Sequence, residues 1–165
     1  MSALLPYERQ KALDYAKRWA YDRNPAYYDF HNLGGDCTNF ISQCLYAGCG
    51  VMNYKPTFGW YYISLARRSP AWSAAQYLHA FLINNQGSGP YGEEVSLENV
   101  QLGDIIQLGD EKEHYYHSLL VTAFKEPPNR QNIRITTHTY DAANRPLASY
   151  VSPAYRCIHI LGARG

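Results

Sequence analysis

The spacing of apolar residues changes near Pro90, and this change is the strongest constraint on the fold. Before Pro90 the apolar positions recur at helical intervals, whereas after it they form short runs bounded by glycine, proline and asparagine. Those later runs cover residues 95–100, 105–108, 117–124, 133–139 and 155–161. Helices followed by strands predict an α+β domain whose helices pack on a mostly antiparallel sheet or half-barrel. A chain of 165 residues without internal repeats is expected to form a single domain over residues 1–165.

Three segments of the first half have helical spacing. The first is expected over residues 6–23, opened by Pro6 and closed by Asn24-Pro25. The second begins at Cys37 and runs to about residue 47, where glycines end it. The third is predicted to begin with a capping box, in which Ser73 caps the helix and Gln76 reaches back.

Composition excludes several classes of partner. The net charge is +1 and no basic run occurs, so nucleic acid is not an expected partner. No window has the roughly 18 consecutive apolar residues of a membrane span. The first residues lack a secretory signal, so we expect either an intracellular protein or a domain of a longer exported chain. The sequence leaves the oligomeric state open.

The segment of residues 34–45 places a cysteine at the start of a helix. Gly34-Gly35 form a turn, Asp36 is a candidate helix cap, and Cys37 follows directly. The apolar positions after it lie on one helical face: Phe40, Ile41, Cys44 and Leu45. The positive end of the helix dipole favours a thiolate over a thiol, so Cys37 is a candidate nucleophile near neutral pH.

The other cysteines are interpreted as structural thiols. Cys44 lies on the apolar stripe, Cys49 lies at the end of the same helix, and Cys157 is in a late strand. A chain of this size does not need disulfides. A metal site that used His114, His117 and the cysteines is an alternative, but the cysteines lack paired C-x-x-C spacing. We therefore expect neither a metal nor another cofactor.

A cysteine nucleophile needs a base, and the base needs a group that fixes its ring. His117 opens the apolar run of a strand, so the sheet would hold it rigidly. His138 lies at the end of the run that should pair with that strand, and a hairpin would place the two rings near one another on one face. His159, in a C-terminal strand, is interpreted as structural.

Several blocks of the chain resemble the bacterial putative amidase domain family. The most specific block is Asp36-Cys37-Thr38-Asn39-Phe40. Further blocks are Asn24-Pro25-Ala26-Tyr27, Ser69-Pro70-Ala71-Trp72, Leu102-Gly103-Asp104-Ile105-Ile106, Tyr116-His117-Ser118 and Thr137-His138-Thr139-Tyr140-Asp141. That family is similar, more distantly, to the NlpC-type and CHAP cell-wall hydrolases of the papain-like group. The resemblance implies a papain-like fold with the nucleophile at a helix N-terminus.

The resemblance also implies roles for individual residues. Cys37 matches the nucleophile, His117 the base and His138 the third, orienting position, for which Asp141 is a competitor. The Cys37 backbone N–H would support the oxyanion. Papain-type enzymes also use a glutamine about six residues before the cysteine; here His31 lies at that distance and Asn32 is next to it. Asp104 is interpreted as a turn residue that makes hydrogen bonds.

These expectations describe a cysteine amidase or peptidase that cleaves an amide through a thioester. The resemblance makes peptidoglycan peptides the expected substrate. One alternative is a non-catalytic module that binds cell wall or glycan, because the 16 tyrosines could serve as stacking platforms. Another is an acyltransferase that uses the same Cys/His pair with an amine in place of water.

Overall fold

The computed structural model describes residues 3–165 and contains helices in its first half and strands mainly in its second. The four α-helices are α1 (Arg9–Trp19), α2 (Cys37–Cys49), α3 (Pro70–Ser73) and α4 (Ala75–Asn84). The strands are β1 (Leu4–Leu5), β2 (Gly89–Val95), β3 (Ile105–Gly109), β4 (Tyr115–Ala123), β5 (Arg134–Thr137), β6 (Ala142–Pro146) and β7 (Ala154–Arg164). Single turns of 3-10 helix occur at Leu97–Asn99 and Leu147–Ser149.

All strand pairs are antiparallel and form one open sheet in the order β1-β7-β3-β4-β5-β6, with β2 also paired to β7. The long strand β7 joins the two parts of this sheet. Its last residues pair with β1 and β2, whereas its first residues pair with β3. The predicted class, helices packed on a mostly antiparallel sheet, is therefore confirmed.

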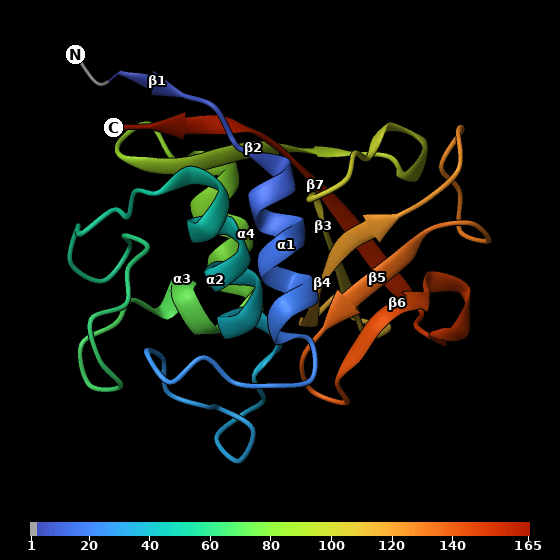
Figure 1. The fold of residues 1–165 in the computed structure, drawn as a ribbon, viewed down its shortest axis with the longest axis horizontal. Coiled ribbons are helices and arrows are strands. Elements are labelled where there is room, and N and C mark those ends of the chain that lie inside the picture. Colours follow the sequence, from blue (N-terminus) through green and yellow to red (C-terminus); the bar gives the residue numbers. More distant parts are fainter. Residues whose placement is uncertain (1–2) are drawn as a thin grey trace.

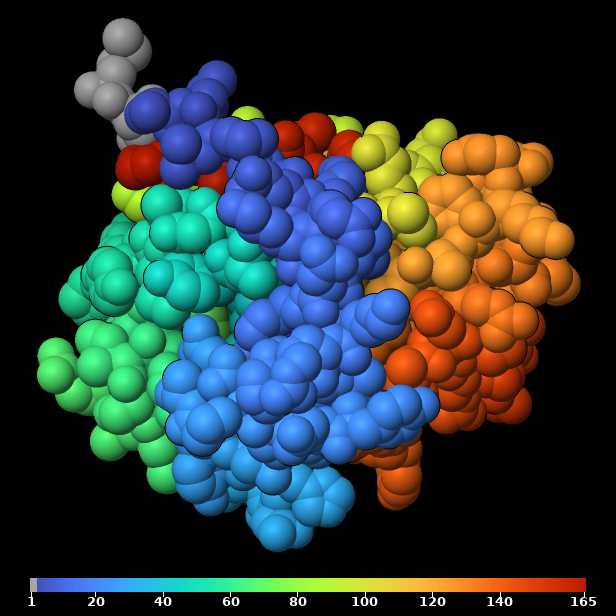
Figure 2. Space-filling view, in the orientation of Figure 1, coloured from blue at the N-terminus to red at the C-terminus, as the bar shows by residue number. Residues whose placement is uncertain are grey.

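The sheet has a core on each face because neighbouring residues of a strand point to opposite sides. Ile105 and Leu120 pack against the helices, together with Phe40, Ile41 and Leu45 of α2. Ile106 and Leu119 pack on the other face, under the loops and short helices. The helices gather on one side of the sheet in Figure 1. Figure 2 shows the first segment of the described chain, in blue, lying between the teal and green helical side and the orange strands.

Several element boundaries differ from the sequence prediction. Helix α1 is shorter than residues 6–23, and residues 142–146, which lie outside the predicted runs, form the edge strand β6. In the run of residues 95–100, Leu97–Asn99 form a 3-10 turn, and the strand β2 lies before it, at Gly89–Val95. The capping box is wrong: Ser73 ends α3, and the Gln76 side chain accepts a hydrogen bond from Arg156 instead of reaching back. Tertiary contacts therefore override a local capping pattern here. Within residues 3–165, no helix has the length and apolarity needed to cross a bilayer.

Candidate functional site

The turn before α2 sets the position of Cys37. Gly34 and Gly35 have φ angles of 85° and 98°, a region that favours glycine. A Cβ at residue 35 would also lie 3.0 Å from the Thr139 hydroxyl oxygen, which itself accepts a hydrogen bond from the Asp36 backbone N–H at 2.9 Å. The turn is thus held against Thr139, and Cys37 is the first residue of α2, as predicted. The N–H groups of such a first turn have no acceptor within the helix.

Cys37 lies against the backbone of β4. Its sulfur is 3.7 Å from the carbonyl oxygen of Tyr116 and 3.8 Å from the hydroxyl oxygen of Thr38. The Thr38 hydroxyl in turn lies 2.9 Å from the hydroxyl of Ser118. The first turn of α2 is therefore docked on the strand that carries His117.

The end of β5 explains why this part of β4 can receive Cys37. Leu120 pairs with Thr136, and the Thr137 hydroxyl donates to the Ser118 carbonyl at 2.9 Å. Strand β5 ends at Thr137, and the chain then turns through Thr139 and Tyr140, both with positive φ. Residues 116–118 thus have no strand partner on that side, and Cys37 contacts them there.

The register of these strands separates His117 from His138. Extending the pairing of Leu120 with Thr136 by two residues places Ser118, not His117, opposite His138. Directly opposed residues point to the same face, so His117 and His138 point to opposite faces. The hairpin was predicted correctly, but the expectation that both rings share one face is wrong.

His117 lies on the face of the sheet on which Ile106 and Leu119 pack, opposite the helices. It is 9% exposed, and its ring centroid is 5.9 Å from that of Tyr150. Across residues 3–165 the structure contains no hydrogen bond to either ring nitrogen of His117. Burial, with a smaller effect from the Arg145 charge, lowers the pKa of His117 to about 4. The imidazole is therefore neutral at pH 7.

Burial also determines the protonation state of the Cys37 thiol. The side chain is 6% exposed, and burial raises the pKa of the thiol. The Ser118 backbone N–H and the Thr38 groups act in the opposite direction but do not outweigh it. The helix N-terminus was expected to favour a thiolate at rest. The structure instead favours a neutral thiol at rest, because desolvation exceeds the dipole effect.

His138 belongs to a buried polar cluster on the helical side of the sheet. Its Nδ1 lies 2.5 Å from an Asp36 carboxylate oxygen, and its Nε2 lies 2.7 Å from the carbonyl oxygen of Trp19. The ring is 1% exposed and stacks on Phe40 with centroids 3.9 Å apart. His138 therefore ties the residue before Cys37 to the end of α1 and does not contact His117.

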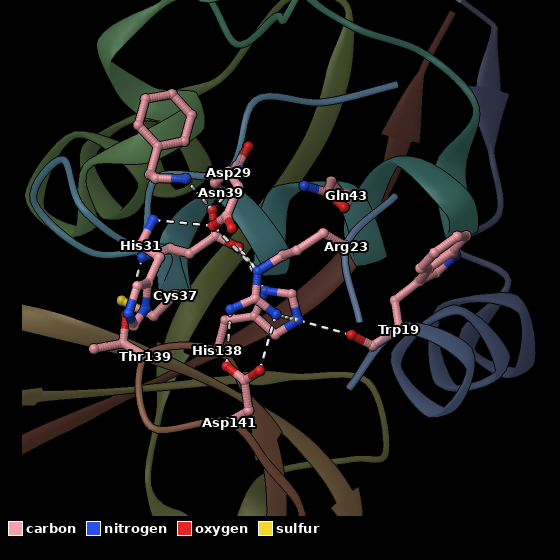
Figure 3. Close-up of polar contacts among 12 residues, drawn as sticks. Trp19, Arg23, Asp29, His31, Cys37, Asn39, Gln43, His138, Thr139 and Asp141 are labelled. Atoms are coloured by element: carbon pink, nitrogen blue, oxygen red, sulfur yellow. Dashed lines mark hydrogen bonds and ion pairs between the residues drawn. The ribbon is translucent and has the colours of Figure 1, made fainter. Parts of the chain in front are cut away.

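Arg23 connects this cluster to three carboxylates (Figure 3). Two of its nitrogens donate to Asp141 at 2.9 and 3.0 Å, and its Nε donates to Asp29 at 3.1 Å. The same Nε lies 3.5 Å from Asp36. Asp141, the competing candidate for orienting His117, is thus engaged by a bidentate ion pair with Arg23.

Asp36 stabilises the turn rather than capping the helix backbone. No cap hydrogen bond from its side chain is formed. One carboxylate oxygen instead accepts from the Phe30 backbone N–H and from the Asn39 side chain, both at 2.8 Å. The predicted cap is therefore wrong, and the carboxylate fixes the loop that leads into α2.

The upstream oxyanion candidates are at the surface. His31 and Asn32 are both exposed, and the His31 backbone N–H donates to Asp29 at 3.0 Å. Neither side chain has a hydrogen bond in the described part of the chain. The Cys37 backbone N–H, at the start of α2, remains the candidate oxyanion donor.

The family model described as a putative amidase domain matches residues 6–161. The chain belongs to that family. Membership suggests an amidase-type hydrolase.

A relative in Bacillus subtilis (strain 168), the uncharacterized protein YhbB, is 30% identical over 151 residues. The match covers 90% of this chain and 47% of that protein, so the chain spans about half of the relative's length. No solved structure matches the chain.

The remaining candidate residues of this amidase-family domain are structural. Cys44, Cys49 and Cys157 are free and buried, and burial raises their pKa values, to about 11 for Cys49 and about 12 for Cys157. His159 donates to the buried Asp104 carboxylate at 2.8 Å. Within residues 3–165 no group of three or more histidine, cysteine or acidic side chains could hold a metal ion.

Two residues that lie next to the candidate residues were not singled out from the sequence. Arg23 organises the carboxylate cluster, but its partners lie up to 118 positions away, and no local pattern indicated them. Tyr150 lies in a short segment of little periodicity, and one tyrosine among 16 carries no signal of its own. Both are visible only once the sheet and the loops around it are assembled.

Proposed function

We propose that this chain is a cysteine-dependent amidase that hydrolyses an amide bond through a thioester at Cys37. The observation that carries the proposal is the docking of the first turn of α2, with Cys37, on the strand that carries His117. A thiol at a helix N-terminus beside a histidine-bearing strand is the arrangement expected of the papain-like group. Family membership supports the same class of reaction.

The first half-reaction begins with a neutral thiol and a neutral imidazole. As the Cys37 sulfur bonds to the carbonyl carbon, His117 takes the thiol proton. The carbonyl oxygen becomes an oxyanion, which the Cys37 backbone N–H stabilises. His117 then gives the proton to the amide nitrogen, the C–N bond breaks, and the amine leaves a thioester on Cys37.

The second half-reaction regenerates the enzyme. Neutral His117 removes a proton from water as the water oxygen attacks the thioester carbon. The C–S bond then breaks, the carboxylic acid is released, and the proton returns to the sulfur. If an amine attacks in place of water, the same residues transfer the acyl group to it.

A peptide bond of bacterial peptidoglycan is the substrate we propose, on the basis of the resemblance to cell-wall hydrolases. The test is digestion of purified peptidoglycan, with released fragments identified by mass spectrometry. We expect Cys37→Ala and His117→Ala to reduce release by about 1000-fold or more, since a nucleophile and its base act as a unit.

A matched control lies at the other end of the same helix. Cys49→Ala removes a buried thiol from the last residue of α2 and should keep activity within about threefold, because Cys49 is remote from the reaction. Release of equal fragments by Cys37→Ala would overturn the cysteine mechanism. Binding of peptidoglycan without cleavage by the wild type would favour the binding module, and products that carry an added amine would favour acyl transfer.

A further inference from the structure

One buried polar atom in the described part of the chain has no hydrogen-bond partner. Among residues 3–165, the Tyr150 hydroxyl is the buried side-chain oxygen or nitrogen left unsatisfied. Proteins seldom leave such groups without a partner, and each one calls for a physical explanation. A phenylalanine would fill the same space without this cost, so the hydroxyl itself needs a reason.

The position of the Tyr150 ring does not depend on that hydroxyl. Its backbone N–H donates to Leu147 at 3.1 Å, and its carbonyl accepts from Arg130 at 2.8 Å. Arg145 lies over one face of the ring, 3.9 Å from its centroid, and its Nε donates to the Ser149 hydroxyl at 2.8 Å. Backbone contacts and packing thus hold the ring in place. Burial raises the pKa of the phenol and the Arg145 guanidinium acts to lower it, but the hydroxyl has no hydrogen-bond partner in residues 3–165.

The ring that carries this free hydroxyl lies near the ring of the proposed base. The rings of His117 and Tyr150 have centroids 5.9 Å apart, and His117 is the site residue whose ring has no described hydrogen bond. A negative charge on Cys37 would raise the pKa of Tyr150, so the thiol belongs to the same neighbourhood. The two groups first considered for orienting His117, His138 and Asp141, are bound elsewhere.

We propose that Tyr150 is the positioning residue for His117: its hydroxyl accepts a hydrogen bond from one ring N–H and leaves the other nitrogen free for the thiol proton. This inference rests on the proposed function of the Cys37–His117 pair. Catalytic hydrogen bonds are often long or misaligned without substrate and form as the reaction proceeds, which explains the unmade bond in the resting protein.

A hydroxyl in this position differs chemically from a carboxylate. It fixes the orientation and tautomer of the imidazole without adding a negative charge that would stabilise the imidazolium. The neutral state of His117 at pH 7 agrees with such a partner. Burial raises the pKa of Tyr150 as well, so the phenol keeps its proton.

The test uses Tyr150→Phe, which removes one oxygen and keeps the ring. Tyr155→Phe, at a half-exposed tyrosine five positions away, is the matched control, and His117→Ala is the reference. The first measurement is the rate at which iodoacetamide alkylates Cys37 between pH 5 and 10, read at that residue by peptide mass spectrometry. The second is kcat and KM for amide hydrolysis, and the third is the urea midpoint of unfolding.

We expect Tyr150→Phe to slow Cys37 alkylation at pH 7 toward the His117→Ala rate. We also expect it to lower kcat by about 10- to 100-fold with KM within about twofold, because a misplaced base affects the transition state alone. Its urea midpoint should equal or exceed that of the wild type, since the hydroxyl has no partner to lose. Tyr155→Phe should match the wild type in all three measurements.

Two results of the alkylation experiment would overturn the inference, and only one of them would also overturn the proposed function. If His117→Ala slows alkylation and Tyr150→Phe does not, Tyr150 does not position His117, while the Cys37–His117 pair stands. If neither variant changes alkylation, His117 does not act on Cys37, and the inference falls together with the proposed function.

Discussion

At the scale of single residues, burial sets the charge state of the proposed catalytic pair. Cys37 begins a helix, where a dipole favours a thiolate, yet it is 6% exposed and its pKa is raised. His117 is similarly enclosed, and no described carboxylate contacts its ring. In the proposed reaction both groups therefore start uncharged, and proton transfer would accompany attack rather than precede it.

The lowered pKa of His117 has a consequence for stability. The pKa of His117 is about 4 in the folded protein, against about 6.5 for an ordinary histidine. Between those values the unfolded chain binds a proton that the folded protein does not. The free energy of unfolding should therefore fall as pH drops from about 6.5 to 4, by about 3 kcal/mol from this residue alone.

We expect the His117→Gln variant to lack this pH-dependent part of the free energy of unfolding. Urea unfolding at pH 7 and at pH 4.5 measures it: the wild type should lose about 2 to 3 kcal/mol more than the variant. His114→Gln, at an exposed histidine, should follow the wild type. Equal losses in the wild type and His117→Gln would contradict the buried, neutral state.

At the scale of elements, the packing of α2 depends on a close approach near its C-terminal end. Gly48 lies under the ring of Tyr7, and a Cβ there would overlap that ring. The ring cannot move away freely, because the Tyr7 hydroxyl donates to the Gly103 carbonyl at 2.8 Å. The same segment is tied by a hydrogen bond from the Glu8 N–H to the Gly48 carbonyl at 2.8 Å.

Gly48→Ala should therefore destabilise the protein by about 1 to 3 kcal/mol, measured by urea unfolding, because the added methyl overpacks this contact. A destabilisation would be informative, because replacing glycine by alanine in a helix interior otherwise stabilises the helix by about 1 kcal/mol. In a Tyr7→Ala background the same substitution should be neutral or stabilising. A cost that is equal in both backgrounds would show that the Tyr7 ring is not its cause.

At the scale of the whole molecule, one buried carboxylate connects the helical layer to the sheet. Asp104, fully buried before β3, accepts from Arg9 of α1 at 2.8 Å. It also accepts from His159 at 2.8 Å and from the Ile160 backbone N–H at 3.0 Å, both in β7. The interpretation of Asp104 as a turn residue that makes hydrogen bonds agrees with this, but its partners reach well beyond the turn.

Asp104→Asn should cost about 3 kcal/mol in urea unfolding, because one carboxylate oxygen becomes an NH2 group that faces donors and Arg9 loses its counter-charge. Asp14→Asn is the control. Asp14 lies on α1 and accepts a hydrogen bond from Gln10, and the side-chain oxygen of an asparagine can accept the same bond. A cost below about 1 kcal/mol for Asp104→Asn would contradict the connecting role.

The local spacing of apolar residues was enough to predict much of the fold. The helical stripe of residues 37–45 predicted α2 because its spacing is set by the helix itself. The apolar runs likewise predicted β3, β4, β5 and β7, with ends displaced by a few residues. The edge strand β6 was missed because Asn144 and Pro146 are turn residues by composition, and only pairing with β5 makes this segment a strand.

For the candidate site, the sequence by itself determined that Cys37 begins a buried helix and that His117 begins a strand. Both follow from short-range periodicity and turn residues. Only the tertiary structure decided which groups meet: the register of β4 and β5 points His138 away from His117, and Arg23 binds Asp141. It also placed the ring of Tyr150, whose hydroxyl has no partner in residues 3–165, 5.9 Å from the ring of His117. The physical reason is that register, burial and long-range contacts depend on how all the elements pack together, whereas helix and strand spacing are written within a few neighbouring residues.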